Sequence, residues 1–440
     1  MSYKTYDEYK DSKNKWIGKI PSTWSTIKAK HCFKLSGGYA FKSDDFIEEG
    51  IPLVRIGDIT NGTIDFDNCK RLPLEYATIM KEFLVKPGDI LIALTGATIG
   101  KIGQIPNTDE KILLNQRVGK LSSNASNYYK YILSSDLIKK QIMLIAEGSA
   151  QENISNEDIG NFEIFDIDDH TKQRIANYLD KETSKIDETI AKNEELIQLL
   201  EEKRIALINQ VVTKGLNPDV LMKDSGIEWI GEIPEHWEVN RLKFLITKNA
   251  QYGANCEPEQ DETKFDYRYV RITDIDDNAS LKDTVVYLSK EDSKGFILNE
   301  GDILFARSGA TVGKTYLYNQ VDGNCCFAGY LIRYIPNKQL LNPKFLLYFS
   351  FSKSYSEWIN IVSTQATIQN VSADKYDNLI ISLPDTNEQN EIVSYLDKEI
   401  SNITQIISKI KQNIALLEEY KTSLIHHVVT GKVDVRGEEI

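Results

Sequence analysis

The sequence predicts an α+β protein of two globules, each followed by a long α-helix, with the two helices packed as an antiparallel coiled coil with pseudo-twofold symmetry. Three observations lead to this prediction. Isoleucines recur every eleven residues in two long segments, the chain repeats itself in the same order, and each copy contains short β-branched stretches bounded by turn residues. Such a pattern is typical of a duplicated unit rather than of a short-period solenoid.

The eleven-residue repeat identifies the two long helices. Apolar residues at i and i+4 that recur every eleven residues form a narrow stripe along one face of an α-helix. The period is about 3.67 residues per turn, close to that of a straight helix, so two such helices can stay in contact over many turns. We predict that the stripes pack on each other through eight isoleucines: Ile175, Ile186, Ile197 and Ile208 in the first helix, and Ile392, Ile403, Ile414 and Ile425 in the second.

Ordered matches between the two halves of the chain define the duplication. Residues 88–91 return as residues 301–304, an offset of 213, and residues 178–182 return as residues 395–399, an offset of 217. From these matches we expect four segments: a first globule at 1–168, a first helix at 169–216, a second globule at 217–386 and a second helix at 387–440.

The globules are predicted to consist mainly of strands and turns. Three stretches of the first globule are rich in β-branched residues and are bounded by Gly, Asn, Asp and Pro: residues 54–59, 89–94 and 118–121. Amphipathic helices are expected at 128–143 and at 345–361. Polar loops at 148–151 and 363–366 precede the return to the long helices, and residues 384–388 predict a stop followed by a cap where the second long helix begins.

Composition and cysteine usage exclude several classes of protein. Of the 440 residues, 41% are hydrophobic, which is enough for two or three domains with cores of their own. The first residues form no apolar signal region, and no apolar run approaches the length of a membrane span. Five cysteines form no C-x-x-C pair, which favours buried thiols in a reducing cytoplasm over disulfides or a zinc site. We therefore expect a cytoplasmic protein without a metal.

The negative charge of the chain is concentrated in the helices and the joining segments. The net charge is −13, which by itself argues against a nucleic-acid partner. Residues 28–120, however, hold 13 Lys and Arg against 12 Asp and Glu, and residues 241–338 hold 13 against 14. Because the globules are near neutral, each can carry a local basic face, so the charge distribution permits DNA binding.

Motifs that resemble catalytic sites fail on spacing or context. Gly96 and Gly100 before Lys101, and Gly309 and Gly313 before Lys314, are separated by three residues, whereas a phosphate-binding P-loop has four and leads into a helix. We interpret both segments as tight turns between strands. Glu201-x-Lys203 and Glu419-x-Lys421 lie in the predicted helices, the five histidines form no cluster, and no Asn/Asp-Pro-Pro-aromatic tetrapeptide of adenine methylases occurs. The sequence predicts a non-catalytic chain with no cofactor of its own.

A series of motifs in a fixed order resembles a known family. The motifs are Trp-Ile-Gly-x-Ile-Pro at 16–21 and 229–234, the turns at 95–101 and 308–314, Leu-Asn-Gln-Arg-Val at 114–118, Tyr-Leu-Asp-Lys-Glu at 178–182 and 395–399, and Val-Val-Thr-Gly-Lys at 428–432. Together they resemble the specificity subunit of type I restriction–modification enzymes, and the resemblance covers essentially the whole chain. The copies differ most where residues 37–42 of the first correspond to residues 251–255 of the second.

The resemblance implies a role in DNA recognition. In that family each globule is a target-recognition domain that reads one half of a split, asymmetric DNA site. The paired helices set the spacing and bind two modification subunits, which carry S-adenosylmethionine and methylate adenine. Restriction subunits join this complex to translocate and cut DNA. The implied partners are therefore double-stranded DNA, the modification subunits and the restriction subunits, with no membrane.

Residue types that contact DNA backbones and base edges supply the candidate site. The candidates are Tyr39, Lys42, Arg55, Thr98, Lys101, Gln116 and Arg117 in the first globule, and Tyr252, Asn255, Arg271, Arg307, Thr311 and Lys314 in the second. For each residue a solvated surface position or an internal turn bond is an equal alternative. Two rival functions also remain open: an enzyme that modifies or cuts DNA alone, and a coiled-coil adaptor that binds only proteins.

Overall fold

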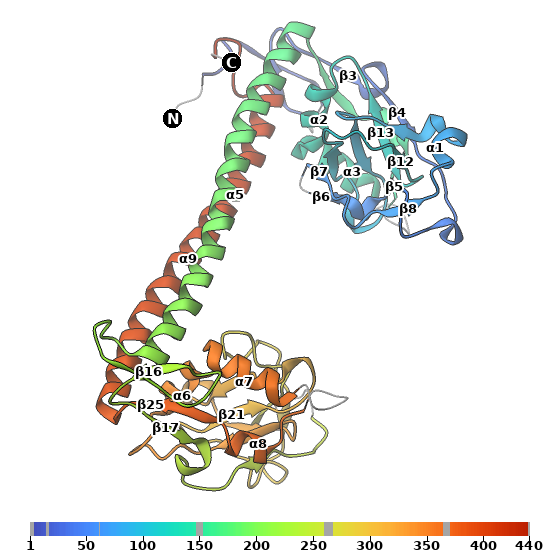
Figure 1. The fold of residues 1–440 in the computed structure, drawn as a ribbon. Helices are drawn as coiled ribbons and strands as arrows, with labels where there is room; N and C mark the ends of the chain where they lie inside the picture. The colour runs from blue at the N-terminus through green and yellow to red at the C-terminus, as the bar shows by residue number, and fades with distance from the viewer. Residues whose placement is uncertain are drawn as a thin grey trace. The chain divides into compact units, whose positions relative to one another are not determined.

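The computed structural model describes residues 4–14, 17–60, 62–146, 153–258, 267–363 and 370–438. Trp16, the predicted loop 148–151 and residues 364–366 of the second loop lie outside this range. The chain divides into two units: unit 1 comprises Met1–Asn193 and Lys411–Ile440, and unit 2 comprises Glu194–Ile410. Each unit contains one globule and part of each long helix (Figure 1).

The globule of unit 1 is built on two four-stranded sheets. Its strands are β1 (Tyr9–Asp11), β2 (Lys19–Pro21), β3 (Ser25–Lys28), β4 (Lys34–Gly37), β5 (Ile51–Val54), β6 (Ile59–Thr60), β7 (Thr63–Ile64), β8 (Lys70–Leu72), β9 (Leu84–Val85), β10 (Ile90–Ala93), β11 (Ile102–Gln104), β12 (Ile112–Leu114), β13 (Val118–Ser122) and β14 (Glu163–Asp166). Its helices are α1 (Tyr76–Ile79), α2 (Ser126–Ser134), α3 (Asp136–Ala146) and α4 (Asn156–Gly160). One sheet has the antiparallel order β11-β10-β13-β4, and the other has the order β8-β5-β12-β9 with β5 parallel to β12.

The globule of unit 2 repeats this arrangement. Its strands are β15 (Met222–Asp224), β16 (Glu232–Pro234), β17 (Glu238–Arg241), β18 (Gln251–Tyr252), β19 (Tyr267–Val270), β20 (Tyr287–Leu288), β21 (Ile303–Ala306), β22 (Thr315–Leu317), β23 (Cys325–Phe327), β24 (Leu331–Tyr334) and β25 (Ile380–Leu383). Its helices are α6 (Pro343–Phe349), α7 (Lys353–Ser363) and α8 (Ala373–Asp377). The order β18-β24-β21-β22 matches β4-β13-β10-β11 of unit 1. The order β20-β19-β23, with β19 parallel to β23, matches β8-β5-β12 and lacks a fourth strand among the described residues. The predicted α+β class and the duplication are confirmed.

Each globule has two cores, which lie on the two faces of one strand, β10 in unit 1 and β21 in unit 2. The side chains of the strand point alternately into one core and the other. On β10, Ile90 and Ile92 point into a core shared with α2 and α3, while Leu91 and Ala93 point into a core shared with the second sheet. Successive side chains on a strand face opposite sides, and both sides of this strand are covered, so it is apolar throughout. β21 repeats the arrangement, with Ile303 and Phe305 in one core and Leu304 and Ala306 in the other.

The prediction of one strand over residues 54–59 is wrong. β5 ends at Val54, and Ile56–Asp58 form a 3₁₀ helix. The Asp58 carboxylate accepts hydrogen bonds from the backbone N–H of Arg55, at 2.8 Å, and from its side chain, and these bonds turn the chain out of the sheet. Local bonds of this kind compete with a strand ladder and leave no trace in the hydrophobic pattern. The strands predicted at 89–94 and 118–121 are confirmed as β10 and β13.

Each predicted amphipathic helix is in fact two helices. Residues 128–143 fall in α2 and α3, which are separated by Ser135 in an extended conformation with φ −74° and ψ 156°. Residues 345–361 fall in α6 and α7. Ser135 Oγ donates to the Ile132 carbonyl at 2.6 Å, and Ser350 Oγ donates to the Leu347 carbonyl at 2.7 Å. At both breaks a serine hydroxyl thus bonds a carbonyl three residues back, where the chain leaves the helix.

Two long helices, α5 (Asp169–Lys214) and α9 (Thr386–Val429), lie side by side in each unit (Figure 1). In unit 1 the beginning of α5 packs against the end of α9, and Lys421 forms an ion pair with Asp187 at 2.6 Å. In unit 2 the end of α5 packs against the beginning of α9. The helices are therefore antiparallel. Six of the eight stripe isoleucines are buried and two, Ile197 and Ile414, are half-buried.

A tyrosine–aspartate pair attaches each globule to a long helix. Tyr131 of α2 donates to Asp180 of α5 at 2.6 Å, and Tyr348 of α6 donates to Asp397 of α9, which also pairs with Lys344 at 2.7 Å. Burial and the neighbouring carboxylate raise the pKa of both phenols, so each tyrosine remains a hydrogen-bond donor. Asp180 and Asp397 are the central residues of the repeated Tyr-Leu-Asp-Lys-Glu motif. The motif therefore has a structural role in orienting each globule on its helix.

Both long helices begin at an aspartate cap, as the sequence predicts for the second. The Asp168 carboxylate accepts from the Thr171 backbone N–H at 2.9 Å, and the Asp385 carboxylate accepts from the Glu388 N–H at 3.0 Å. Bonds from the Thr171 hydroxyl and N–H lower the pKa of Asp168. Its contribution to stability is thus present above the ordinary carboxyl pKa and is lost as the pH falls through the lowered value.

We predict that Asp168→Ala lowers the free energy of unfolding by about 1 kcal/mol at neutral pH, because an orphan N–H of the first turn loses its acceptor. Asp168→Asn keeps an acceptor and is the matched control. It is expected to lose only a small part of this stability, and that stability should no longer depend on acid pH. Urea unfolding of the full chain, at neutral and at acidic pH, measures both effects. Equal losses for the two variants at neutral pH would contradict the capping role.

Candidate nucleic-acid interface

Four segments of unit 1 meet at the end of its antiparallel sheet, and we call this region the junction of unit 1: residues 37–42, 94–101, 114–118 and 153–156. Backbone hydrogen bonds fix their arrangement. Tyr39 N donates to the Leu114 carbonyl at 2.9 Å, and Gln116 N donates back to the Tyr39 carbonyl at 3.1 Å. Leu94 N donates to the Arg117 carbonyl at 3.0 Å. The junction is therefore a rigid backbone frame rather than a set of loose loops.

The junction of unit 2, residues 252–256, 307–314, 327–331 and 370–373, has the same backbone bonds. Ala254 N donates to the Phe327 carbonyl at 2.9 Å, and Gly329 N donates to the Ala254 carbonyl at 2.7 Å. Arg307 N donates to the Tyr330 carbonyl at 3.0 Å. One frame thus occurs twice, although the sequences around it differ.

Two glycines, one in each junction, determine which residues of the two units correspond; we call this correspondence the register between the copies. A Cβ atom on Gly38 would lie 2.0 Å from the Leu114 carbonyl oxygen, and one on Gly253 would lie 2.3 Å from the Ala328 carbonyl oxygen. Only glycine permits two backbones to approach this closely. The register pairs Tyr39 with Ala254, Ala40 with Asn255, Leu94 with Arg307, Gln116 with Gly329 and Arg117 with Tyr330. It resolves the segment where the two copies could not be aligned from sequence.

The junction of unit 1 presents aromatic and basic side chains. Tyr39 is 42% exposed and packs its ring 5.1 Å from Phe41 and 5.4 Å from Phe83. Gln116 and Arg117 are exposed at the adjacent turn. Lys42 and Lys101 are also exposed and lie on the same two segments as Tyr39 and Thr98. This combination of a stacking ring, an amide and cationic side chains suits contact with nucleic acid.

The junction of unit 2 presents a different set on the same frame. The Arg307 guanidinium lies 4.8 Å from the ring centre of Tyr252, whose hydroxyl accepts from the Ala373 N–H at 3.0 Å. Tyr330 is 61% exposed, and Asn255 is exposed beside Gly329. Sequence reasoning missed Tyr330, because its counterpart, Arg117, is a residue of another type; only the offset of 213 connects the two positions.

The Gly-Ala-Thr segments are turns between antiparallel strands, as predicted. Gly96–Thr98 connect β10 to β11, and Gly309–Thr311 connect β21 to β22, each as one 3₁₀ turn. Gly96 and Gly309 have φ of +68° and +70°, values that other residues rarely adopt. The Thr98 hydroxyl is buried and has no partner among the described residues, and the Thr311 hydroxyl donates to the Ser308 carbonyl at 3.2 Å. Both hydroxyls therefore face the protein, and that of Thr311 bonds within the turn.

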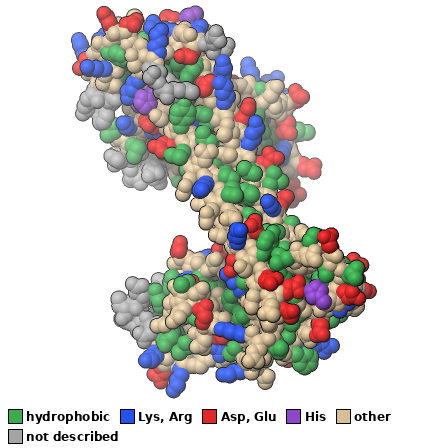
Figure 2. All heavy atoms as spheres, turned by 90° about the vertical axis from the view of Figure 1, so that its left-hand side faces the viewer, with side chains coloured by type: hydrophobic (Ala, Val, Ile, Leu, Met, Phe, Trp, Pro, Cys, Tyr) green, Lys and Arg blue, Asp and Glu red, His purple; other side chains and the backbone are tan. Residues whose placement is uncertain are grey.

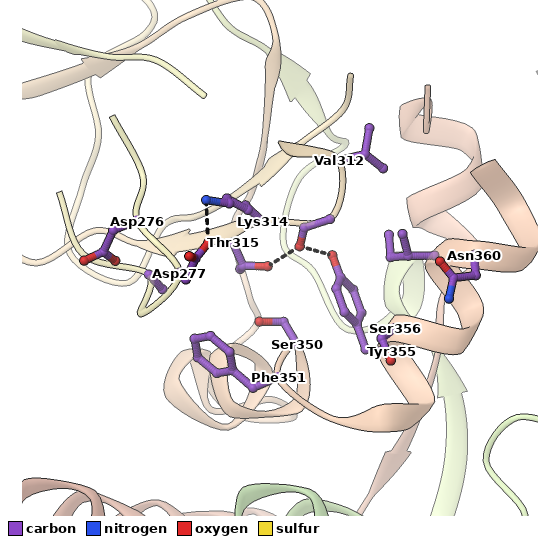
Figure 3. A pocket seen from close by; sticks show the side chains of 13 residues that line it. Asp276, Asp277, Val312, Lys314, Thr315, Ser350, Phe351, Tyr355, Ser356 and Asn360 are labelled. Atoms are coloured by element: carbon purple, nitrogen blue, oxygen red, sulfur yellow. Dashed lines mark hydrogen bonds and ion pairs between the residues drawn. The ribbon is translucent and has the colours of Figure 1, made fainter. Parts of the chain in front are cut away.

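Lys314 differs from its counterpart Lys101 in forming an ion pair with an exposed carboxylate. Its ammonium lies 2.7 Å from the Asp277 carboxylate, which lowers the pKa of Asp277. The pair stands beside a hollow of about 340 Å³ (Figure 3). In Figure 3, Tyr355 reaches the end of the turn, where its hydroxyl donates to the Gly313 carbonyl at 2.9 Å. Lys101 is exposed and has no ion pair with a described residue, so it is the better placed of the two lysines for a phosphate.

Arg55 and Arg271 are committed to buried carboxylates. Arg271 contacts Asp274 through Nε at 3.0 Å and Nη2 at 2.8 Å, and the bond to this carboxylate raises the pKa of Arg271. Arg55 makes the same pair with Asp58, through Nε and Nη2 at 3.3 Å. Asp58 and Asp274 are only 3% and 2% exposed, so each needs its arginine as a counter-charge. The geometry places both arginines beside the junctions but turns their side chains inward.

The surface of the globules carries mixed charge, and their buried thiols are unreactive. In Figure 2, Lys and Arg side chains are interspersed with Asp and Glu over both globules. Burial raises the pKa of Cys69, Cys325 and Cys326 to about 12, so these thiols are unreactive. Within the described residues no group of three His, Cys, Asp or Glu side chains is placed to hold a metal ion. No helix in the described part of the chain has an apolar stretch long enough to span a bilayer.

Comparison with known proteins identifies the family. The model of the type I restriction modification DNA specificity domain matches residues 21–202 and 234–416. These matches cover most of the chain, which therefore belongs to the type I restriction–modification specificity-subunit family, the DNA-recognition rather than the catalytic subunits of those systems.

Relatives and solved structures agree with this assignment. The EcoBI specificity subunit of Escherichia coli is 24% identical over 426 residues, covering 94% of this chain and 87% of its own. The MjaVIII specificity subunit of Methanocaldococcus jannaschii is 31% identical over 164 residues, covering 36% and 39%. The crystal structure of the HsdS subunit from Thermoanaerobacter tengcongensis has a TM-score of 0.52 at 16% identity and covers 94% of this chain and 98% of its own. A chain from a study of complex assembly in a type I R-M system reaches a TM-score of 0.66, at 16% identity over 93% and 98%. Both structural likenesses show the fold.

We predict that Arg271→Ala lowers the free energy of unfolding by about 1–3 kcal/mol, because the buried Asp274 loses its counter-charge. Arg117→Ala removes an exposed arginine without a side-chain partner and is the matched control, expected to change stability by less than about 0.5 kcal/mol. Urea unfolding followed by tryptophan fluorescence compares the two variants. A larger loss in Arg117→Ala would show that the division into supporting and presented arginines is wrong.

Proposed function

We propose that this chain reads a bipartite, asymmetric DNA site as the specificity subunit of a type I restriction–modification complex, each globule reading one half. The observation that carries the proposal is the pair of junctions, which share a backbone frame but present different side chains. Phosphate contacts position a protein on DNA, whereas side chains at base edges determine which sequence is bound. One frame with two side-chain sets is what a protein needs to read two different half-sites.

The proposed partners of the helices are two modification subunits, which would carry S-adenosylmethionine and methylate adenine, with restriction subunits joining them. Exposed apolar residues on α5 and α9 support an interface there: Leu196, Leu199, Ile205, Ile406, Leu416 and Tyr420, each at least 43% exposed. Apolar side chains repeated along a helix are a common means of docking another helix. In this proposal the antiparallel helices also set the distance between the two half-sites.

A protein-only adaptor is the second candidate, because the same apolar helix residues would serve it. The net charge of −13, which lies outside the two near-neutral windows of the globules, is also compatible with an adaptor. An adaptor does not require two different side-chain sets on one frame. It predicts that the chain, with its modification subunit present, fails to retard any DNA duplex.

Single-molecule methylome sequencing tests the proposal. Cells that carry this gene with its modification partner are compared with cells that lack it. We expect a new N6-methyladenine motif of two specified parts separated by a fixed unspecified gap. The absence of any new motif, with the modification subunit expressed, together with the absence of DNA retardation, would favour the adaptor.

Lengthening both helices tests their role in spacing. We predict that inserting eleven residues after Glu201 of α5 and eleven after Ile407 of α9 widens the unspecified gap by about five base pairs. Eleven residues preserve the apolar stripe and add about 16 Å at about 1.5 Å per residue, against about 3.4 Å per base step. In the control, eleven residues of each helix at the same positions are replaced by eleven others with the same apolar pattern. The helices keep their length, so the original gap should remain. A methylome motif with an unchanged gap in the lengthened protein would contradict the proposal that the helices set the spacing of the half-sites.

A further inference from the structure

The arginines of this chain fall into two groups, according to whether the guanidinium has an acceptor within the protein. All eleven arginines lie among the described residues, and nine of them give their guanidinium groups to an internal acceptor: Arg55, Arg71, Arg174, Arg204, Arg241, Arg268, Arg271, Arg333 and Arg436. Arg117 and Arg307 make no side-chain hydrogen bond or ion pair with any described residue. Each unit therefore has one arginine whose donors are not used by the fold.

The same backbone hydrogen bond occurs once in each unit. Arg117 lies on its acceptor side in unit 1, and Arg307 lies on its donor side in unit 2. In unit 1 the Arg117 carbonyl accepts from the Leu94 N–H, and in unit 2 the Arg307 N–H donates to the Tyr330 carbonyl. In the register set by the two glycines, Arg117 corresponds to Tyr330 and Arg307 corresponds to Leu94. Each junction thus holds one arginine beside this bond, from the 114–118 segment in unit 1 and from the 307–314 segment in unit 2.

Both arginines have side-chain donors that remain available. The Arg307 guanidinium stacks on Tyr252, and its Nε atom is buried with no partner among the described residues, although a buried donor of this kind costs free energy when it is not bonded. Arg117 is exposed in a tight turn, and its backbone is fixed by a bond from the Arg117 N–H to Asn115 Oδ1 at 3.3 Å. Free donors on a backbone held by hydrogen bonds are the arrangement expected for groups that bind a ligand outside the chain.

We propose that Arg117 and Arg307 are the specificity-determining residues that read a guanine, one in each half of the DNA site. The inference rests on the proposed function. A guanidinium presents a planar fork of donors, and the major-groove edge of guanine presents two acceptors, O6 and N7, that match it. The other arginines near the junctions, Arg55 and Arg271, cannot take this role while they neutralise Asp58 and Asp274. The alternative for Arg117 and Arg307 is a contact to phosphate, which would carry no sequence information.

The test uses the complete complex with its modification subunits and DNA duplexes that carry its methylated motif. Each guanine of the motif is replaced in turn by 7-deazaguanine, which keeps base pairing but lacks the N7 acceptor. We expect wild-type complex to lose affinity at one guanine in each half, by about 5- to 150-fold. Arg117→Ala should become insensitive to the replacement in the first half only, and Arg307→Ala in the other half only. In the methylome each variant should accept other bases at that one position.

Lys101→Ala is the matched control, because Lys101 is an exposed cation on the junction of unit 1 that the geometry suits to phosphate. It should weaken binding to all duplexes alike and lower the salt dependence of binding, while sensitivity to 7-deazaguanine persists. If Arg117→Ala and Arg307→Ala behave as Lys101→Ala does, they contact phosphate and the inference is overturned. It is also overturned if the variants keep the wild-type sensitivity to each replaced guanine. Failure of the proposed function is distinguishable, since wild-type complex would then methylate no split motif at all.

Discussion

The close approach of two backbones at Gly38 and at Gly253 is the constraint on which the rest of each globule depends. Since no side chain fits between the strands there, segments distant in sequence exchange backbone hydrogen bonds and form one rigid junction in each unit. Side chains on that frame can change without disturbing it, because the bonds that define it come from the backbone. Duplication of such a frame gives this protein two copies of one backbone arrangement that present different side chains.

Charge pairing separates the residues that build the frame from those that it presents. Asp58 and Asp274 are buried, and each takes up an arginine that stands beside a junction, so those arginines support the fold. Lys314 forms an ion pair with Asp277, whose side chain is exposed, whereas Lys101 is exposed and has no ion pair with a described residue. The net charge of a globule therefore says little about its binding face. What matters is which cations have an internal acceptor, and that property appears only in three dimensions.

The sequence was sufficient for the features that depend on periodicity or repetition. The eleven-residue stripe predicts the antiparallel helices, and ordered repeats predict two globules of one fold; the boundaries at 168, 216 and 386 and the DNA contacts of the candidate residues remain predictions. Features set by local hydrogen bonds were not predictable from the hydrophobic pattern. The Asp58 turn ends a strand early, and two predicted helices are each divided near a serine, Ser135 and Ser350. The alignment of residues 37–42 with the second copy could be made only from the carbonyl oxygens that lie against Gly38 and Gly253, and the sequence does not give their positions.

Electron cryomicroscopy of the full complex on DNA that carries its methylated motif is the most direct test of the account. The central claim is that each junction faces the base edges of one half-site. We predict that residues 37–42, 94–101 and 114–118 of unit 1 lie against one specified half, and that residues 252–256, 307–314 and 327–331 of unit 2 lie against the other. Junctions covered by a protein subunit, with DNA bound on another face of the globules, would contradict the claim.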